Sequence, residues 1–288
     1  MTRTQTRPSR RPQQAAATAF HHGIIWFLLA VTLYPVAWLV GGSFKPQSEI
    51  GGGGVLPLNP TTQNYTRALE GIGGTPAWLF FANSAILGAL AVTGVVLSSS
   101  LAAYAFARLR FRLRGLFFAL TIGTMLLPVH VTIVPQYIIF QRLGLVDTFA
   151  PLVLGKFLAV EAFFTFLMVQ FLRAVPRELD EAARLDGCGH FRTYWYLTLP
   201  MLRPAIVTSS VFAFVWSWND FLGPLIYLNT PSKYPLPSAL RVYVNEMGQS
   251  NFGALMALSV LAIVPVAIFF FFFQRYLVEG VATQGLKG

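Results

Sequence analysis

Residues 176–187 read Pro-Arg-Glu-Leu-Asp-Glu-Ala-Ala-Arg-Leu-Asp-Gly, a short charged stretch in a chain whose neighbouring segments are almost continuously apolar. The stretch predicts a helix over about 177–186. Proline is favoured in the first turn, where its missing N–H costs nothing, and the acidic residues that follow complement the positive end of a helix. Gly187 suits the left-handed position just beyond a helix end. We therefore expect a discrete helix between two apolar segments.

The expected helix has a smooth face that suits contact with another surface. Leu179, Ala182 and Ala183 fall on one side of it, at the spacing of helical neighbours. The alanines let a partner approach the backbone closely, and charged groups flank them. A solvated helix that merely connects two membrane spans is the alternative. The stretch by itself therefore indicates a helix that can dock on another surface, but it does not indicate which surface.

The composition favours a membrane protein. The chain has 288 residues, of which 55% are hydrophobic and only 11% charged, and its mean hydropathy is +0.59. A soluble domain averages about 25% charged residues, so this chain has too few to cover a globule of its size with polar side chains. The single cysteine, Cys188, excludes an internal disulfide and a multi-cysteine metal site.

Apolar stretches predict six membrane-spanning helices, because about 20 apolar residues suffice to cross the hydrocarbon core. The expected spans are about 23–44, 81–105, 116–140, 150–172, 204–228 and 252–274. Lys156 and Glu161 interrupt the fourth span, and the fifth is expected to continue past Asp220. Residues 1–22 are polar and basic and predict a disordered tail. The expected fold is all-α, with residues 23–288 as a single transmembrane domain and the charged helix between spans four and five.

The positive charges indicate the orientation, since cytoplasmic loops of membrane proteins are rich in Lys and Arg. Fifteen of these residues lie in the two terminal tails and the second and fourth connections, against five in the alternate connections. Both termini and the charged helix are therefore expected in the cytoplasm. The same segregation accounts for the net charge of +10, so no nucleic-acid partner is expected. The outward connections 45–80 and 229–252 are expected to be loops without a core of their own.

A longer pattern begins inside the charged stretch. Glu181-Ala182-Ala183 is followed after three residues by Gly187, then after nine residues by Leu197, one residue and Leu199-Pro200. This spacing resembles the EAA signature of permease subunits in binding-protein-dependent ABC importers, with Leu197 where the family usually has isoleucine. Further resemblances follow in chain order at residues 34–46, Asn83-Ser84, residues 102–108 and residues 218–224. The overall pattern looks most like the maltose-type sugar permeases.

The resemblance implies that the charged helix is the coupling helix, which seats in a groove of a cytoplasmic ATPase subunit. The implied coupling residues are Glu181, Ala182, Ala183, Asp186, Gly187, Leu199 and Pro200. Closure of the ATPase dimer around ATP would then tilt the bundle between inward-open and outward-open states. The implied partners are a second permease subunit, the ATPase dimer, an extracytoplasmic solute-binding protein and membrane lipid. The implied location is the bacterial or archaeal cytoplasmic (inner) membrane.

Motifs for catalysis or ATP binding are missing from the sequence. Gly155-Lys156-Phe157 lacks the hydroxyl that holds magnesium in a phosphate-binding loop, and no His-Glu-x-x-His zinc motif occurs. The Gly-x-Ser-x-Gly elbow of serine hydrolases is absent as well. The chain is therefore not expected to be an enzyme or to hold a cofactor, and the energy for transport has to come from a partner.

Polar residues inside membrane spans are costly and are therefore candidates for a substrate pathway. The candidates are Glu161, Trp218, Asn219 and Asp220. Amide and carboxylate groups bond sugar hydroxyls, and the aromatic faces of Trp216 and Trp218 could stack on a sugar ring. A role in helix packing is the alternative for these residues. For Glu161, the alternative is pairing with Lys156 within the bundle.

The sequence thus predicts one permease subunit of an ATP-driven importer for a sugar, of one or several rings, delivered by a solute-binding protein. The first alternative is an ABC importer for a non-sugar solute such as a phosphorylated polyol or an amine. The second is an ion-coupled secondary transporter, which neither internal inverted repeats nor a chain of buried carboxylates supports here. A membrane-embedded enzyme is a remote third, because no pairing of a nucleophile with a base is found.

Overall fold

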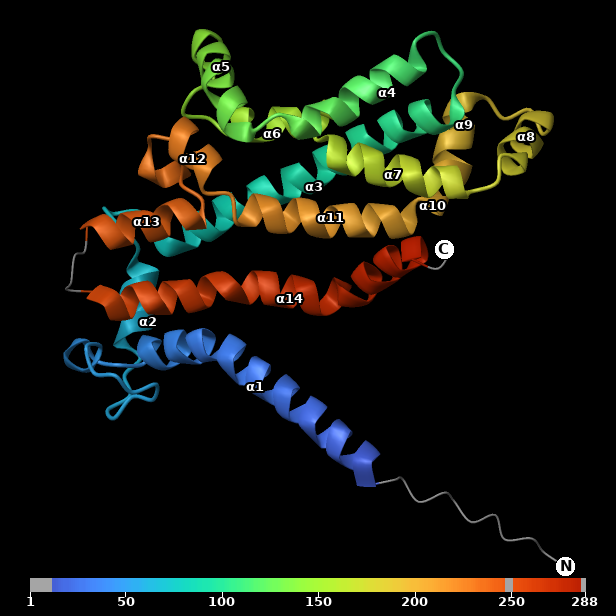
Figure 1. Ribbon diagram of the computed structural model, residues 1–288. Coiled ribbons are helices and arrows are strands. Elements are labelled where there is room, and N and C mark those ends of the chain that lie inside the picture. The colour runs from blue at the N-terminus through green and yellow to red at the C-terminus, as the bar shows by residue number, and fades with distance from the viewer. Residues whose placement is uncertain (1–11, 247–250, 286–288) are drawn as a thin grey trace, which may run out of the picture. The chain divides into compact units, whose positions relative to one another are not determined.

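The computed structural model describes residues 12–246 and 251–285, and its regular elements there are helices apart from one isolated bridge (Figure 1). The first half contains α1 (Pro12–Ser43), η1 (Gln47–Glu49), α2 (Gln63–Glu70), α3 (Ala77–Arg108), α4 (Arg114–Gly123), η2 (Thr124–Leu126) and α5 (Val129–Arg142). The middle contains α6 (Ala150–Phe157), α7 (Ala162–Ala174), α8 (Glu178–Leu185), α9 (His190–Thr193), η3 (Tyr194–Thr198) and α10 (Leu199–Met201). The last part contains α11 (Arg203–Trp218), α12 (Leu222–Tyr227), η4 (Pro231–Lys233), α13 (Leu236–Glu246) and α14 (Phe252–Gly285).

Four helical stretches are long and apolar enough to cross a membrane: Thr18–Ser43, Ala77–Arg108, Ala150–Ala174 and Phe252–Gln274. Two more qualify if each bent pair of helices is taken as one span: Arg114–Leu126 with His130–Arg142, and His190–Met201 with Arg203–Trp218. In chain order these stretches follow the six expected spans. The two bent pairs correspond to the third and fifth of them.

The N-terminal helix begins earlier than expected. α1 starts at Pro12, so residues 12–22 are helical rather than a disordered tail, and residues 1–11 lie outside the described part. Proline is favourable at a helix start, and the run of glutamine and alanine after it consists of good helix formers. No residue in the most apolar part of this span is buried within the described chain. That surface is therefore available to lipid or to another subunit.

Breaks interrupt three of the expected spans. The third bends by 105° next to Pro128, which lacks the N–H that a continuous helix needs. The fourth is interrupted between Phe157 and Ala162. Ala159 adopts a left-handed φ of 52° in that interruption, a conformation that is uncommon for a residue with a side chain. The break thus lies between Lys156 and Glu161, the two charged residues that interrupt this span in the sequence, and Ala150–Ala174 as a whole still qualifies as a membrane span.

The fifth span also stops short of the expected end at residue 228. α11 ends at Trp218, and α12 begins at Leu222 after a break. Asn219 turns its side-chain amide back to Val215 O at 2.8 Å. The Asp220 carboxylate accepts the Gly223 N–H at 3.1 Å, which satisfies a free donor in the first turn of α12. These two side chains stabilise the break.

The described residues of Met1–Ala68 and Gln249–Val260 form one compact unit. The amide of Asn64 holds it together by donating to Ser43 O at 2.9 Å and Lys45 O at 2.7 Å. The Glu49 carboxylate accepts hydrogen bonds from the backbone and side chain of Asn59, at 3.2 and 2.8 Å. A few polar anchors thus order a glycine-rich connection that has little apolar core.

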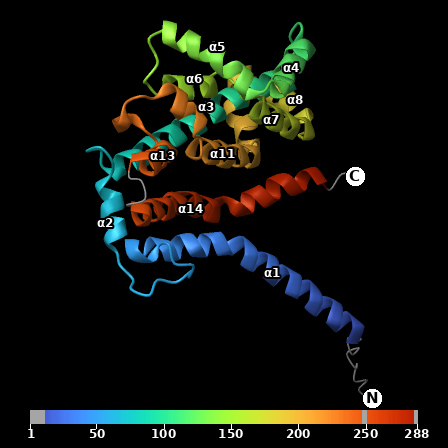
Figure 2. The same cartoon turned by 60° about the vertical axis from the view of Figure 1, so that its left-hand side comes forward.

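The described residues of Leu69–Gly248 and Leu261–Gly288 form the second compact unit, with α3 at its centre. α3 packs against α6, α7 and α11, and these helices lie side by side in both views (Figures 1 and 2). Small residues make the close approach possible. At Gly94 a Cβ atom would lie 3.0 Å from the Lys156 carbonyl carbon. The buried cluster toward one end of α3 comprises Ala103, Ala107, Met168, Val169, Leu172, Leu202 and Ala205.

Polar contacts fasten the connection after α12 to this bundle. Asn83 donates to Ser232 O at 2.9 Å and Tyr234 O at 3.0 Å, and the Ser84 hydroxyl accepts the Leu236 N–H at 2.8 Å. This polar pair near the start of α3 is thus the partner of a segment about 150 residues further along the chain. The connection between 229 and 246 is therefore structured by α3.

Asp147 organises the same connection from another side. Its carboxylate accepts the backbone N–H groups of Asn229 and Thr230 at 2.9 and 3.0 Å, the Thr230 hydroxyl at 2.6 Å and the Lys233 ammonium at 2.9 Å. The Thr230 hydroxyl first, and then Lys233, lower the pKa of Asp147 below its usual range. Hydrogen bonds to an ionised carboxylate favour the charged form, so folding and ionisation of Asp147 support each other.

We expect Asp147→Ala to lower the free energy of unfolding by about 2 kcal/mol, because charge-assisted hydrogen bonds contribute about 1.5–3 kcal/mol each and those to Asp147 are partly exposed. The pKa is lowered in the folded state, so this stabilisation is fully present above the unfolded pKa of about 3.9 and is lost as the pH falls through the folded value. Thermal unfolding in detergent at pH 7 and below pH ~3 measures both effects. An equal difference between the two proteins at both pH values would contradict the role of the ionised carboxylate.

Candidate functional site

The charged helix forms where the sequence predicts it. α8 spans Glu178–Leu185 and has Glu178, Asp180 and Glu181 in its first turn. Gly187 has a φ of 80°, its N–H donates to Arg184 O at 3.0 Å, and the next N–H donates to Ala183 O at 2.9 Å. This pair of bonds is the Schellman end of a helix, and its left-handed residue is usually glycine. The chain therefore leaves α8 abruptly, as a separate element.

Much of the expected coupling surface is open. Glu181, Ala182, Asp186 and Gly187 are exposed, and Ala183 is half-buried. Leu185 is 89% exposed. Within the described chain, nothing covers this apolar side chain, and Ala182 beside it is exposed as well. α8 therefore presents a surface that a partner could cover.

A buried ion pair fixes the other side of α8 to α3. Arg108 Nε lies 3.0 Å from Asp180 Oδ2, and the two side chains are only 5% and 12% exposed. Arg108 also donates to Val175 O at 3.1 Å, and Arg177 donates to Ala107 O at 3.4 Å. In the sequence, Asp180 is one of the acidic residues at the helix start and Arg108 ends an apolar span, and neither position by itself indicates that the two side chains pair.

Leu199 and Pro200 lie apart from α8, at the bend that leads into α11. The Leu199 N–H bonds to Tyr194 O in the π-helical turn η3, and the chain turns by 74° between the helical stretches on either side of Leu202. Tyr194 is only 3% exposed, and its hydroxyl lies 2.7 Å from Ser100 Oγ of α3. The end of the motif thus shapes a second attachment to α3.

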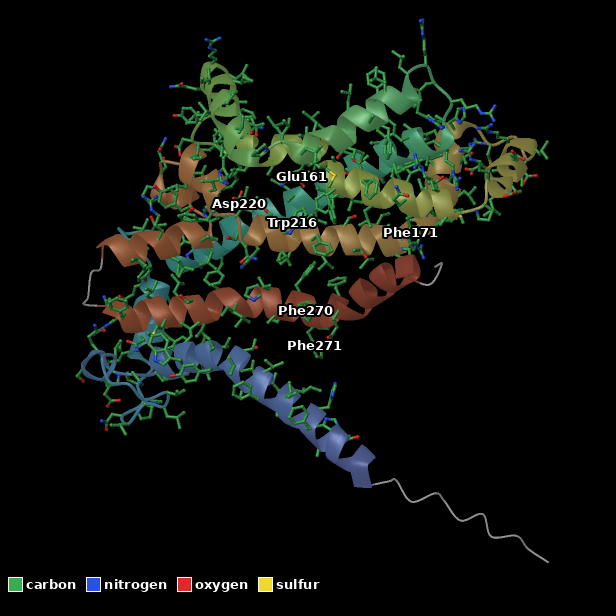
Figure 3. The ribbon with its side chains drawn as sticks, viewed as in Figure 1. Glu161, Phe171, Trp216, Asp220, Phe270 and Phe271 are labelled. Atoms are coloured by element: carbon green, nitrogen blue, oxygen red, sulfur yellow. The ribbon has the colours of Figure 1, made fainter. Side chains whose placement is uncertain are left out.

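The broken fourth and fifth spans meet at a polar cavity of about 200 Å³. Its charged lining residues are Lys156 at the end of α6, Glu161 before α7 and Asp220 between α11 and α12. Lys156 and Glu161 form an ion pair across the break between their helices. Figure 3 shows Glu161, Trp216 and Asp220 in the same region of the second unit. Two of the pathway candidates, Glu161 and Asp220, are therefore brought together.

Trp218 and Asn219 do not line this cavity. The indole N–H of Trp218 donates to Ala262 O of α14 at 3.3 Å, and the residue is 5% exposed. Asn219 bonds to its own helix. Trp216, which is 45% exposed, lines the cavity instead. The helical period explains the difference, since residues two apart on a helix do not share a face.

Among the residues that the structure describes, no cluster of three or more His, Cys, Asp or Glu side chains could hold a metal ion. The geometry therefore describes a helical membrane protein with an exposed docking helix at one place and a charged cavity between broken helices at another. Both features belong to the second compact unit.

Comparison with known proteins identifies the class. Residues 71–283 match the family described as binding-protein-dependent transport system inner membrane component. The chain is 32% identical to the arabinooligosaccharides transport system permease protein AraQ of Bacillus subtilis, over 92% of this chain and 94% of AraQ. It is 32% identical to the sulfoquinovosyl glycerol transport system permease protein SmoH of Agrobacterium fabrum, over 91% of each chain.

The chain belongs to this family of inner-membrane permeases of binding-protein-dependent ABC importers. The predicted family is thereby confirmed, and the chain is the multi-pass permease component rather than the catalytic one. The fold is also confirmed by a solved structure described as a bacterial ABC transporter involved in the import of the acidic polysaccharide alginate. The TM-score is 0.80 at 22% identity, over 94% of this chain and 99% of the solved chain.

We expect Arg108→Met to destabilise the protein by about 3–5 kcal/mol, because it leaves the buried Asp180 carboxylate without its partner. Arg108→Met with Asp180→Leu removes both charges and should recover most of that loss. Arg184→Met, at an exposed position of α8, is the matched control. Thermal unfolding of the four proteins in the same detergent measures the differences. A double variant as unstable as Arg108→Met alone would show that the cost does not come from the unpaired charge.

Proposed function

We propose that this chain is one permease subunit of an ATP-driven importer of a sugar, and that residues 23–288 act as its single transmembrane domain. The names of several relatives support a sugar as the solute. Besides AraQ and SmoH, the chain is 30% identical over 93% of its length, and 88% of the relative, to the diacetylchitobiose uptake system permease protein NgcG of Streptomyces coelicolor. These proteins carry different sugars, so the chemical class is shared while the individual sugar is not.

The observation that carries the coupling role is the two-sided character of α8. One side offers Glu181, Ala182, Gly187 and the exposed Leu185 to a partner, and the other is joined to α3 by the buried pair of Arg108 and Asp180. A cytoplasmic ATPase dimer is the proposed partner of the open side. Its closure around ATP would displace α8, and the ion pair would carry that displacement to α3. Such a two-state element biased by nucleotide can switch the access of the bundle.

The remaining proposed partners are a second permease subunit and an extracytoplasmic solute-binding protein. The apolar surface of α1 favours a membrane-embedded neighbour, because the most apolar part of its span contains no buried residue. The arginines beside α8 favour a cytoplasmic location for it and for both termini. Arg108, Arg110, Arg177 and Arg184 all line a cavity of about 470 Å³ there, and basic residues concentrate on the cytoplasmic side of membrane proteins.

The coupling role predicts that Gly187→Val and Glu181→Lys reduce ATP-dependent uptake by about tenfold or more, in line with coupling energies of 1–3 kcal/mol. Valine strains the left-handed cap, and lysine reverses a charge on the open side of α8. The measurement is uptake of labelled sugar into vesicles that contain all subunits, together with the amount of permease inserted. Arg142→Gln, at an exposed end of α5, is the control. Normal uptake by both α8 variants would exclude α8 as the coupling helix.

The proposed orientation predicts opposite labelling of two engineered cysteines. In a Cys188→Ser background, Arg112→Cys should react with a membrane-impermeant maleimide only in inside-out vesicles, because it lies in a basic connection. Ser232→Cys, in η4, should react only in right-side-out vesicles. Reversed labelling of the pair would place α8 outside the cell and remove any access to an intracellular ATPase.

A further inference from the structure

The cavity between the broken helices has features of a constructed site rather than a packing defect. The chain does not need these breaks to cross a membrane, and breaks expose backbone groups that a lipid environment cannot satisfy. Here the freed groups have specific partners. The Ser98 hydroxyl donates to Lys156 O at 2.6 Å, and Asp220 caps α12. Non-helical backbone at membrane depth is tolerated where it lines a protein cavity, and this backbone does.

Close packing holds the first break in place. Gly94 of α3 lets the Lys156 backbone come so near that an added Cβ would meet it at 3.0 Å. Gly223 of α12 likewise has no room for a side chain, because a Cβ there would lie 2.6 Å from Asp220 Oδ2 and 2.9 Å from Leu152 Cδ2. Each break is therefore kept by a glycine and a polar side chain together.

At least one oxygen of the charged groups in the cavity lacks a hydrogen-bond donor among the described residues. Lys156 is paired with Glu161 through Oε1, which leaves Glu161 Oε2 buried and without a hydrogen-bond partner among the described residues. A buried polar atom of this kind calls for an explanation. The carboxylate of Asp220 comes from the other broken span. The cavity thus carries two carboxylates and one ammonium, with a net charge of −1 if all three are ionised.

Trp216 gives the cavity an aromatic wall. Its ring is partly exposed and is held from behind by Phe163, Phe164 and Phe212, with ring centroids 5.2–5.8 Å away. The volume of about 200 Å³ equals that of about seven water molecules at ~30 Å³ each. Such a space suits a single sugar ring and is too small for an oligosaccharide.

These features favour a polyhydroxylated ring over an ion. Carboxylate oxygens accept hydroxyl protons, the Lys156 ammonium donates, and Trp216 offers a flat apolar face to the C–H side of a ring. A bare cation would have to compete with Lys156, which already neutralises Glu161. We propose that this cavity binds one ring of the imported sugar during its passage through this subunit, with Glu161 and Asp220 bonding its hydroxyls. The proposal rests on the proposed sugar import and assigns a sugar-contacting site to this chain itself.

The test uses a cysteine inside the cavity as a reporter of occupancy. The chain has one native cysteine, Cys188, so Cys188→Ser with Ser217→Cys places a single thiol in the lining. In the purified complete importer, the rate of its reaction with a small methanethiosulfonate reagent is measured with and without arabinotriose, galactobiose or diacetylchitobiose at millimolar concentration. We expect at least one of these sugars to slow the reaction severalfold. Ser210→Cys, elsewhere on α11, is the matched control and should show no protection.

Loss of the carboxylate should weaken this protection. Asp220→Asn is expected to raise the protecting sugar concentration by about 10- to 100-fold, as for a lost hydrogen bond to a charged group. Glu161→Gln should act in the same direction. Because Glu161→Gln leaves Lys156 unpaired, Lys156→Gln with Glu161→Gln serves as a second variant in which neither member of the ion pair is left alone. Ser210→Ala, elsewhere on α11 and outside the cavity lining, removes a hydroxyl that bonds only to its own helix and should leave the protecting concentration unchanged.

The outcomes separate the two proposals. ATP-dependent import of a labelled probe into proteoliposomes tests the proposed function, whereas thiol protection tests the cavity. Absence of protection by all three sugars, or equal protection in Asp220→Asn, the double variant and the parent, overturns the sugar site even when import is normal. Protection by sodium or potassium chloride in place of sugar would also overturn it, in favour of a cation site. Protection without import would leave the sugar site standing and contradict sugar import.

Discussion

The close packing of α3 against its neighbours is the constraint on which the second compact unit depends. Lipid tails are as apolar as the helices, so helix association in a membrane relies on close contact and polar bonds rather than on the hydrophobic effect. α3 supplies both, with Gly88 and Gly94 where neighbours come near and serines where hydroxyls are needed. The Ser98 and Ser100 hydroxyls bond to groups of α6 and η3 respectively.

The same helix links three regions of different chemistry. Near its start, Asn83 and Ser84 hold the connection that follows α12. In its middle, Leu87 lines the charged cavity and Ser98 fixes the break beside it. At its end, Arg108 pairs with Asp180 of α8. One helix, α3, therefore connects α8 with both the cavity and the connection that follows α12. A displacement of α8 can reach these two regions along α3 itself.

The sequence predicted the helices that are determined by residues next to one another in the chain. Proline, acidic residues and Gly187 define α8 within a few positions, and the apolar runs locate the helices that cross the membrane. Lys156 and Glu161 indicate the place of the first break, but the break after Trp218 could not be predicted in this way, because residues 204–228 are apolar enough for a continuous helix. The two interruptions depend on Gly94, Ser98 and Gly223, which act through tertiary contacts. Trp216 and Trp218 both lie on α11, and which of the two faces the charged cavity depends on how that helix is rotated against its neighbours. Arg108 and Asp180 lie 72 positions apart, and charge pattern alone does not pair them.

The exposure of Leu185 has a consequence for how the cell must make this protein. Leu185, Phe191 and Tyr196 are 89%, 72% and 81% exposed and lie within a short stretch of chain. Clustered apolar side chains on a surface promote unwanted association. A copy of the chain produced without a protein to cover this stretch is therefore a candidate for aggregation and for removal by proteases. Synthesis of this chain together with a protein that covers the stretch would prevent that loss, so these three side chains bear on assembly of the importer.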